Sequence, residues 1–308
     1  MTQVSIINTT LALAPNDTLS IHATANHLIQ SSDATATTKA KLSDINQFEK
    51  WLALQKEGTV DAGRIVEYLT YQYSTGKKYA SLQRYKVHLL AYYELEFNKV
   101  QRTALKDLMR GIAKTIGTKQ KQAHALTVNQ LKAMIELCNN KKNNRLGARD
   151  KALLAIGFSC ALRVSEITAL TTKDIKRIDS TRGEVFISSS KTDQAGKGYT
   201  IAVQQGIHIQ ALDAIEAHIK ASKIQEGELL FNLNDSMVSR IIKAYAKELN
   251  IEGVSCHSLR SGFITAAIGA GATIDKVKAI SRHKSTDILM GYIRESDKFK
   301  DNATGRVL

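Results

Sequence analysis

Residues 256–262 read CHSLRSG, and this short stretch does most to decide what the chain folds into. His257 and Arg260 stand three residues apart, so a helix through them places both on one face near its N-terminus. The free N–H groups and the dipole of a helix N-terminus favour a bound anion such as phosphate. A capping histidine beside a surface arginine explains the two residues equally well when they are taken alone.

A second stretch, residues 281–294, reads SRHKSTDILMGYIR. Ser285 can cap a helix on which Ile288, Leu289 and Tyr292 share the inward face. Tyrosines are common in protein cores, so Tyr292 by itself is better interpreted as a packing residue than as a nucleophile.

Two further features stand earlier in the chain. Residues 161–167, ALRVSEI, carry Arg163 and Glu166 towards the end of a mostly apolar helix predicted over 149–170. Such a pair is most simply a surface ion pair, although an arginine that follows buried residues requires an anion. Lys191 lies at the tip of a predicted hairpin, where a lysine usually serves only solubility.

Taken together, six residues follow the order and spacing of the tyrosine recombinase, or phage integrase, family: Arg163, Lys191, His257, Arg260, His283 and Tyr292. The last three intervals are three, twenty-three and nine residues, and they resemble the Cre- and Xer-type enzymes without a gap. Glu166 also matches a position that is Glu or Asp in many members. The resemblance covers about residues 127–296 by motif. One departure is visible, because many members carry Leu-Gly-His where this chain reads Ile280-Ser281-Arg282 before His283.

The resemblance implies transesterification at a DNA phosphodiester. Arg163 and Arg260 would hold the non-bridging oxygens of the transition state, because a guanidinium fork fits phosphate and stays charged. His283 would donate a hydrogen bond to the phosphate. Glu166 would orient Arg163 or His257 rather than touch DNA.

The nucleophile implied by the resemblance is Tyr292, which would remain joined to the DNA as a 3′-phosphotyrosyl link. A phenol with an ordinary pKa near ~10 needs a base, and His257 is expected to serve. Lys191 is the expected acid for the leaving 5′-oxygen. Because several cations serve the phosphate and the phosphotyrosine retains the bond energy, we expect no metal and no nucleotide cofactor.

The composition agrees with a polyanionic partner. Lys and Arg total 43 against 29 Asp and Glu, a formal charge of +14, which favours nucleic acid over a membrane surface or a merely soluble basic protein. No stretch approaches the ~20 apolar residues of a spanning helix, and the N-terminus is a poor secretory signal. Cys138, Cys160 and Cys256 are odd in number and widely spaced, so a reducing cytoplasm, near the nucleoid, is the expected location.

The predicted fold is mainly α with a small antiparallel β-sheet. We expect a flexible arm (1–33), a helical DNA-binding domain (34–117), a linker (118–126) and a mixed α/β catalytic domain (127–308). Apolar residues recur at three- and four-residue spacing in the first domain, which predicts about four helices. Thr127 is expected to cap the first catalytic-domain helix, and two β-rich runs within 175–203 predict the sheet. Further helices are expected at 209–221, 235–249, 258–269, 273–281 and 285–294. The resemblance implies that the two domains form a C-shaped clamp.

Several residues outside the catalytic set are candidates for contact with DNA. The candidates are Lys77, Lys78, Arg84 and Lys86 in the first domain, Lys119 and Lys121 in the linker, and Ser239, Arg240 and Lys243 on the 235–249 helix. Most are expected to meet phosphates rather than bases.

The expected partner is double-stranded DNA with an inverted-repeat recombination site, bound by a homotetramer that joins two such sites. Phe299, Val307 and Leu308 are expected to dock the end of the chain on a neighbouring protomer, and an accessory DNA-bending or directionality protein is the further expected partner. A Cre- or Xer-like system, or a compact integrase of a mobile element, fits best. The alternatives are a type IB topoisomerase or telomere resolvase with the same catalytic group, and a catalytically idle DNA-binding regulator.

Overall fold

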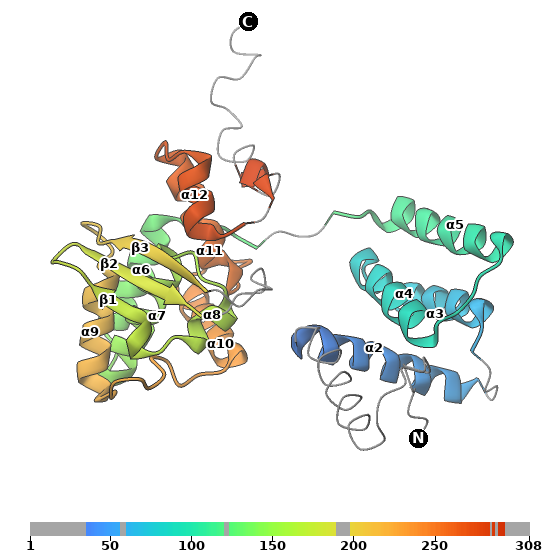
Figure 1. Cartoon of the computed structure of the whole chain (residues 1–308), viewed down its shortest axis with the longest axis horizontal. Helices are drawn as coiled ribbons and strands as arrows, with labels where there is room; N and C mark the ends of the chain where they lie inside the picture. Colours follow the sequence, from blue (N-terminus) through green and yellow to red (C-terminus); the bar gives the residue numbers. More distant parts are fainter. Residues whose placement is uncertain are drawn as a thin grey trace, which may run out of the picture. The chain divides into compact units, whose positions relative to one another are not determined.

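The computed structural model describes residues 35–55, 60–119, 123–188, 198–283, 285–286 and 289–292. The chain divides into two compact units, Met1–Lys121 and Gln122–Leu308 (Figure 1). Each unit has a hydrophobic core of its own. The described residues are mainly helical and contain one small antiparallel sheet, which confirms the predicted fold class.

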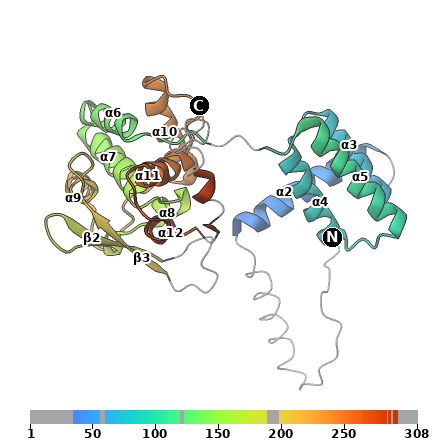
Figure 2. The ribbon, with the colours of Figure 1, turned by 90° about the horizontal axis from the view of Figure 1, so that it is seen from above.

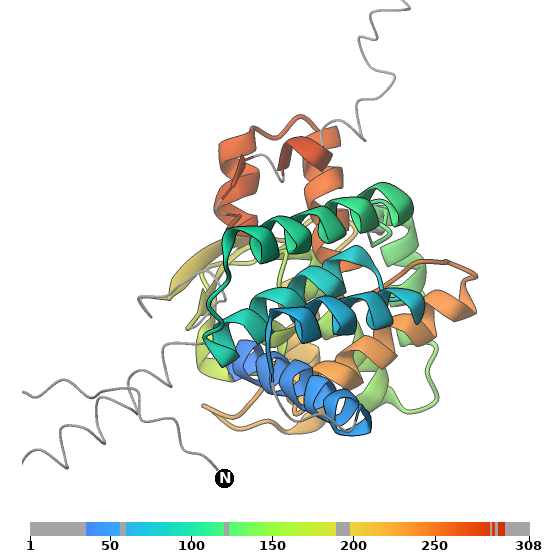
Figure 3. The ribbon, with the colours of Figure 1, turned by 90° about the vertical axis from the view of Figure 1, so that its right-hand side faces the viewer.

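The described part of the first unit is a bundle of helices. They are α2 (Thr35–Leu54), α3 (Ala62–Ser74), α4 (Tyr79–Tyr93) and α5 (Lys99–Ile116). Figure 3 shows α2 and α5 on either side of α3 and α4. Asp61 caps α3 by accepting from the N–H of Arg64, and Asn98 forms a capping box with Gln101 at the start of α5. These caps satisfy backbone donors that would otherwise lack partners.

The second unit is built around α7, which packs against α6, α9 and α11. Its helices are α6 (Val128–Asn139), α7 (Asn144–Ser159), α8 (Val164–Ala169), α9 (Ala211–Ser222), α10 (Asp235–Glu248), α11 (His257–Gly269) and α12 (Ile274–Ser281). Thr127 caps α6 as predicted, accepting from the N–H of Gln130 at 3.2 Å. Four predicted helices are confirmed to within two residues, and the 285–294 helix is described only in part, with residues 289–292 helical.

The sheet consists of β1 (Ile175–Arg177), β2 (Arg182–Ile187) and β3 (Tyr199–Gln204), antiparallel in the order β1-β2-β3. Val185 and Ile201 are register partners and both are buried. Ile187 of β2 and Val203 of β3 are buried as well. This alternation turns one face of the sheet to the core. Figure 2 shows β2 and β3 along one side of the unit. The turn between them, residues 189–197 with Lys191, lies outside the described residues.

The single helix predicted over 149–170 is wrong, because the chain turns between α7 and α8. Ala161 takes a left-handed conformation with φ 48°, and the N–H of Leu162 bonds to the carbonyl oxygen of Gly157 at 3.0 Å. This pattern closes the last turn of α7. Arg163 therefore stands at the N-cap of α8 instead of within a helix.

Residues 123–126, within the predicted linker, are attached to the second unit. The N–H of His124 bonds to the carbonyl oxygen of Gly253 at 3.1 Å, and that of Leu126 to Ser258 at 3.1 Å. The Leu126 side chain is fully buried. A β-carbon at Gly262 would lie 2.2 Å from the Leu126 carbonyl oxygen, so the glycine of the CHSLRSG stretch permits this close approach.

No helix within the described ranges is both long enough and apolar enough to span a membrane.

Candidate active site

Arg163 is held by Glu166 at the start of α8. One oxygen of Glu166, Oε2, accepts from the backbone N–H of Arg163 at 2.8 Å, and Oε1 pairs with Arg163 Nη1 at 2.7 Å. The Glu166 side chain is 1% exposed and that of Arg163 is 17% exposed. The carboxylate therefore fixes the backbone and the guanidinium of Arg163 together.

Arg260 is the largest fully buried side chain among the described residues. It lies on the first turn of α11, and Nη1 donates to the carbonyl oxygen of Ala161 at 2.6 Å. Nη2 donates to the carbonyl oxygen of Ser281 and lies 3.4 Å from the ring nitrogens of His283. Carbonyl oxygens orient the guanidinium, and no carboxylate of the described residues forms a salt bridge with it, so the position favours an anion.

His257 and His283 both face this positive charge. Burial lowers the pKa of His257, with Arg260 and Arg163 lowering it further. Burial also lowers the pKa of His283 to about 4, with Arg260 and Arg163 as the next causes. Both rings are therefore neutral at neutral pH. A neutral imidazole can accept a proton, as a general base must.

The pKa of Arg260 also reports the charge of the site. Burial lowers it to about 9, with Arg163 and Arg282 lowering it further, while Glu166 and Tyr292 act in the opposite direction. Arg260 thus remains charged at neutral pH. The site holds positive charge that a bound anion would stabilise.

Tyr292 comes to the same place from the end of the described chain. It packs against the cluster formed by Ile264, Val277 and Leu289, and it is among the groups that act on the pKa of Arg260. The structure therefore brings together five of the six predicted catalytic residues and Glu166. The sixth, Lys191, lies outside the described residues.

Arg282 is a site residue that the sequence reasoning missed. Its Nη2 pairs with Glu166 Oε2 at 2.5 Å, across 116 residues of sequence. The only signal in the sequence was the unusual arginine directly before His283. We refer to Arg163, Arg260, Arg282 and Glu166 together as the arginine cluster.

The structure separates the candidate DNA-binding residues into different settings. Arg84 is paired in bidentate fashion with buried Asp44, at 2.8 Å for both contacts, so it has a structural task in the first unit. Ser239 bonds to the sulfur of Cys256 at 2.9 Å. Lys77, Lys78, Lys119, Arg240 and Lys243 are exposed and Lys86 is half-buried, while Lys121 is outside the described residues.

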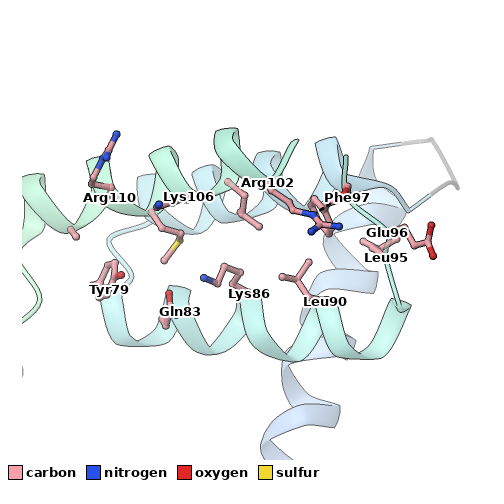
Figure 4. Close-up of a pocket in the computed structure, with 13 residues that line it drawn as sticks. Tyr79, Gln83, Lys86, Leu90, Leu95, Glu96, Phe97, Arg102, Lys106 and Arg110 are labelled. Carbon is pink, nitrogen blue, oxygen red and sulfur yellow. Dashed lines mark hydrogen bonds between the residues drawn. The ribbon is translucent and has the colours of Figure 1, made fainter. Parts of the chain in front are cut away.

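A groove between α4 and α5 adds three cations that the sequence reasoning did not select. Arg102, Lys106 and Arg110 line it from α5, and Lys86 lines it from α4 (Figure 4). We call these four residues the basic groove. Its apolar floor includes the buried Leu105 and Met109. Residues spaced by four share a helix face, and their like charges repel one another. Asp107 offsets part of this charge by pairing with Arg110 at 2.8 Å, and Glu96 also lines the groove.

Within the described ranges, no group of three or more His, Cys, Asp or Glu residues is arranged to hold a metal ion. Cys138 and Cys160 are buried, and burial raises the pKa of the Cys138 thiol to about 11 and that of the Cys160 thiol to about 12. Such thiols are unreactive packing residues.

Comparison with known proteins finds one family throughout. The model of the phage integrase family matches residues 124–298. The integrase/recombinase xerD homolog of Selenomonas ruminantium is 27% identical over 95% of this chain and 90% of its own length. The tyrosine recombinase XerC of Pelobacter propionicus is 24% identical over 82% of each chain. The solved XerH site-specific recombinase, in a post-cleavage complex with a palindromic difH substrate, has a TM-score of 0.60 at 17% identity over 79% of this chain and 73% of its own, which shows a shared fold.

Proposed function

This chain belongs to the phage integrase family of tyrosine recombinases, which cut and rejoin DNA at specific sites, and we propose that it acts through a covalent 3′-phosphotyrosyl link to Tyr292. The observation that carries the proposal is the meeting of Arg163, His257 and Tyr292 around the buried Arg260 in one positively charged site. Each group has a role in transferring a phosphodiester.

In the proposed step the Tyr292 oxygen forms a bond to phosphorus and the bond from phosphorus to the 5′-oxygen breaks. The phenolic proton passes to His257, whose lowered pKa leaves a neutral ring to accept it. The leaving 5′-oxygen takes its proton from Lys191, the role that the family resemblance implies. The reverse attack by a 5′-hydroxyl rejoins the strand, so no external energy source enters.

The transition state carries its developing charge on the non-bridging oxygens of phosphorus. Arg163 and Arg260 are held in place before substrate arrives, through Glu166 and through the carbonyl oxygens of Ala161 and Ser281. Donors fixed in advance stabilise developing charge without reorganisation. His283 adds a ring nitrogen beside Arg260 for the same phosphate.

We place the DNA contacts of the second unit at Ser239, Arg240 and Lys243 on α10, and those of the first unit at the basic groove, with Lys77, Lys78, Lys119 and Lys121 as further phosphate contacts. Arg84 can contact DNA only through the N–H groups that its pairing with Asp44 leaves available.

The substrate we propose is an inverted-repeat site in double-stranded DNA, and the active form is a homotetramer that joins two sites in the cytoplasm, at the nucleoid. Phe299, Val307 and Leu308, outside the described residues, are proposed to dock on a neighbouring protomer. The relatives' names favour a Xer-like recombinase, and a compact integrase of a mobile element is the second candidate. An accessory DNA-bending or directionality protein would set the direction of exchange.

Mapping of covalent adducts tests the proposed function. The protein is mixed with genomic and supercoiled plasmid DNA without magnesium, the reaction is stopped with detergent, and protein-bound fragments are sequenced. We expect adducts at one inverted-repeat sequence. Adducts scattered without sequence preference would favour a type IB topoisomerase, and tight binding with no adduct would favour an idle regulator.

Neutralising the basic groove is expected to weaken DNA binding in a salt-dependent way. The triple change Arg102→Gln, Lys106→Gln and Arg110→Gln removes three phosphate contacts, so the slope of log K against log salt should fall by about 2 to 3. Titration of labelled DNA at several salt concentrations measures this slope. The matched control changes Lys39, Lys41 and Lys50 of α2 to Gln, and an equal fall in its slope would remove the special role of the groove.

A further inference from the structure

Arg282 occupies a backbone conformation that an arginine does not favour. It is the C-cap of α12 with φ 55° and ψ 36°, in the left-handed region that suits glycine best. Despite this, its side chain is only 6% exposed and turns into the protein. A long charged side chain that is buried requires a specific partner, all the more when its residue has a backbone conformation that suits glycine.

That partner is Glu166, which also holds Arg163. Arg282 Nη2 pairs with Glu166 Oε2 at 2.5 Å, and Nη1 donates to the carbonyl oxygen of Ile280 at 2.7 Å. A longer contact of 3.4 Å reaches the carbonyl oxygen of Cys160. Arg282 thus joins the turn that precedes His283 to the turn that precedes Arg163, and so connects the two ends of the site.

Arg282 also changes the net charge of the site. The arginine cluster contains three guanidiniums and one carboxylate, a formal excess of two positive charges. A phosphodiester carries one negative charge, and its pentacoordinate transition state carries about two. Without Arg282 the cluster would retain an excess of only one, and Glu166 would direct its whole charge at Arg163.

We propose that Arg282 is a positioning residue that neutralises Glu166 and thereby leaves Arg163 available to the phosphate. The proposal rests on the proposed function of the site. The contribution of Arg282 grows as negative charge develops on phosphorus in the transition state. Arg282 therefore affects the rate of cleavage more than the affinity for DNA. Arg282 itself contacts Glu166 and backbone carbonyl oxygens and is assigned no contact with DNA.

The test compares Arg282→Gly, Arg282→Lys and wild-type protein on two DNA substrates. One carries the normal phosphodiester at the cleavage site and the other a neutral methylphosphonate, whose transition state holds one negative charge fewer. For Arg282→Gly we expect covalent adduct formation to slow by roughly 10- to 100-fold on the phosphodiester and by less than about 3-fold on the methylphosphonate, with DNA affinity unchanged. Arg282→Lys should recover part of the loss, because it restores the charge.

The matched control is Arg177→Gln, which also removes an arginine paired with carboxylates, Asp213 and Glu216, but on the sheet. It should cleave both substrates at the wild-type rate. Equal losses of Arg282→Gly on both substrates would make Arg282 a merely structural residue and overturn the inference, as would wild-type rates on both. If wild-type protein itself forms no adduct through Tyr292, the proposed function fails and the inference fails with it.

Discussion

The Tyr292→Phe protein is expected to form no covalent adduct with DNA while binding DNA as tightly as the wild type. The change removes one oxygen atom and keeps the ring that packs against Ile264, Val277 and Leu289. The fold and the arginine cluster should therefore persist, and only the nucleophile is lost. A detergent-stopped reaction run on a denaturing gel measures the adduct, and a binding titration measures affinity.

Tyr199→Phe is the matched control, because Tyr199 is an exposed tyrosine of β3 in the same unit. It should form the adduct at the wild-type level. Digestion of the wild-type adduct should yield nucleotides attached to the peptide that contains Tyr292. A detergent-stable adduct formed by Tyr292→Phe would assign the nucleophile to another residue and remove the proposed mechanism.

The sequence predicts the helices and strands well where side-chain periodicity is strong. Thr127 before α6 and the β-branched runs of β2 and β3 are examples, because local capping and burial patterns decide these elements. The turn between α7 and α8 could not be read in this way. No proline or glycine marks it, and Ala161 is held in its left-handed conformation with Arg260 of a distant helix bonded to its carbonyl oxygen.

The same distinction holds for the site. Residue types and spacing select His257, Arg260, His283 and Tyr292, because they lie within a short part of the chain. The pairing of Arg282 with Glu166 joins residues that are far apart in sequence, and only tertiary packing reveals it. Arg84 was selected for its charge among neighbouring lysines, whereas its bidentate partner Asp44 lies 40 residues earlier. Charge alone does not show whether a cation already has a partner.

Arg260→Ala is expected to reduce the rate of DNA cleavage by 10³-fold or more, roughly 4 kcal/mol of transition-state stabilisation. The guanidinium offers paired donors inside a buried site, where each charge-assisted hydrogen bond is strong. Arg260→Lys retains the charge but lacks the planar fork, so its rate should fall between those of Arg260→Ala and the wild type. Single-turnover cleavage of a labelled substrate measures all three rates.

Because Arg260 is buried, a slow variant could simply be misfolded, and the titration of His283 separates the two cases. Burial is the main cause of the lowered pKa of His283, which is about 4, and the positive charge of Arg260 is the next cause. A folded Arg260→Ala protein without this positive charge should show the His283 pKa displaced upward, towards the ordinary value of 6.5. Histidine ring signals followed by NMR between pH 4 and 8 report this pKa. An unchanged His283 pKa in a folded variant, or cleavage near the wild-type rate, would place the Arg260 guanidinium outside the reacting site and leave the phosphate to Arg163 alone.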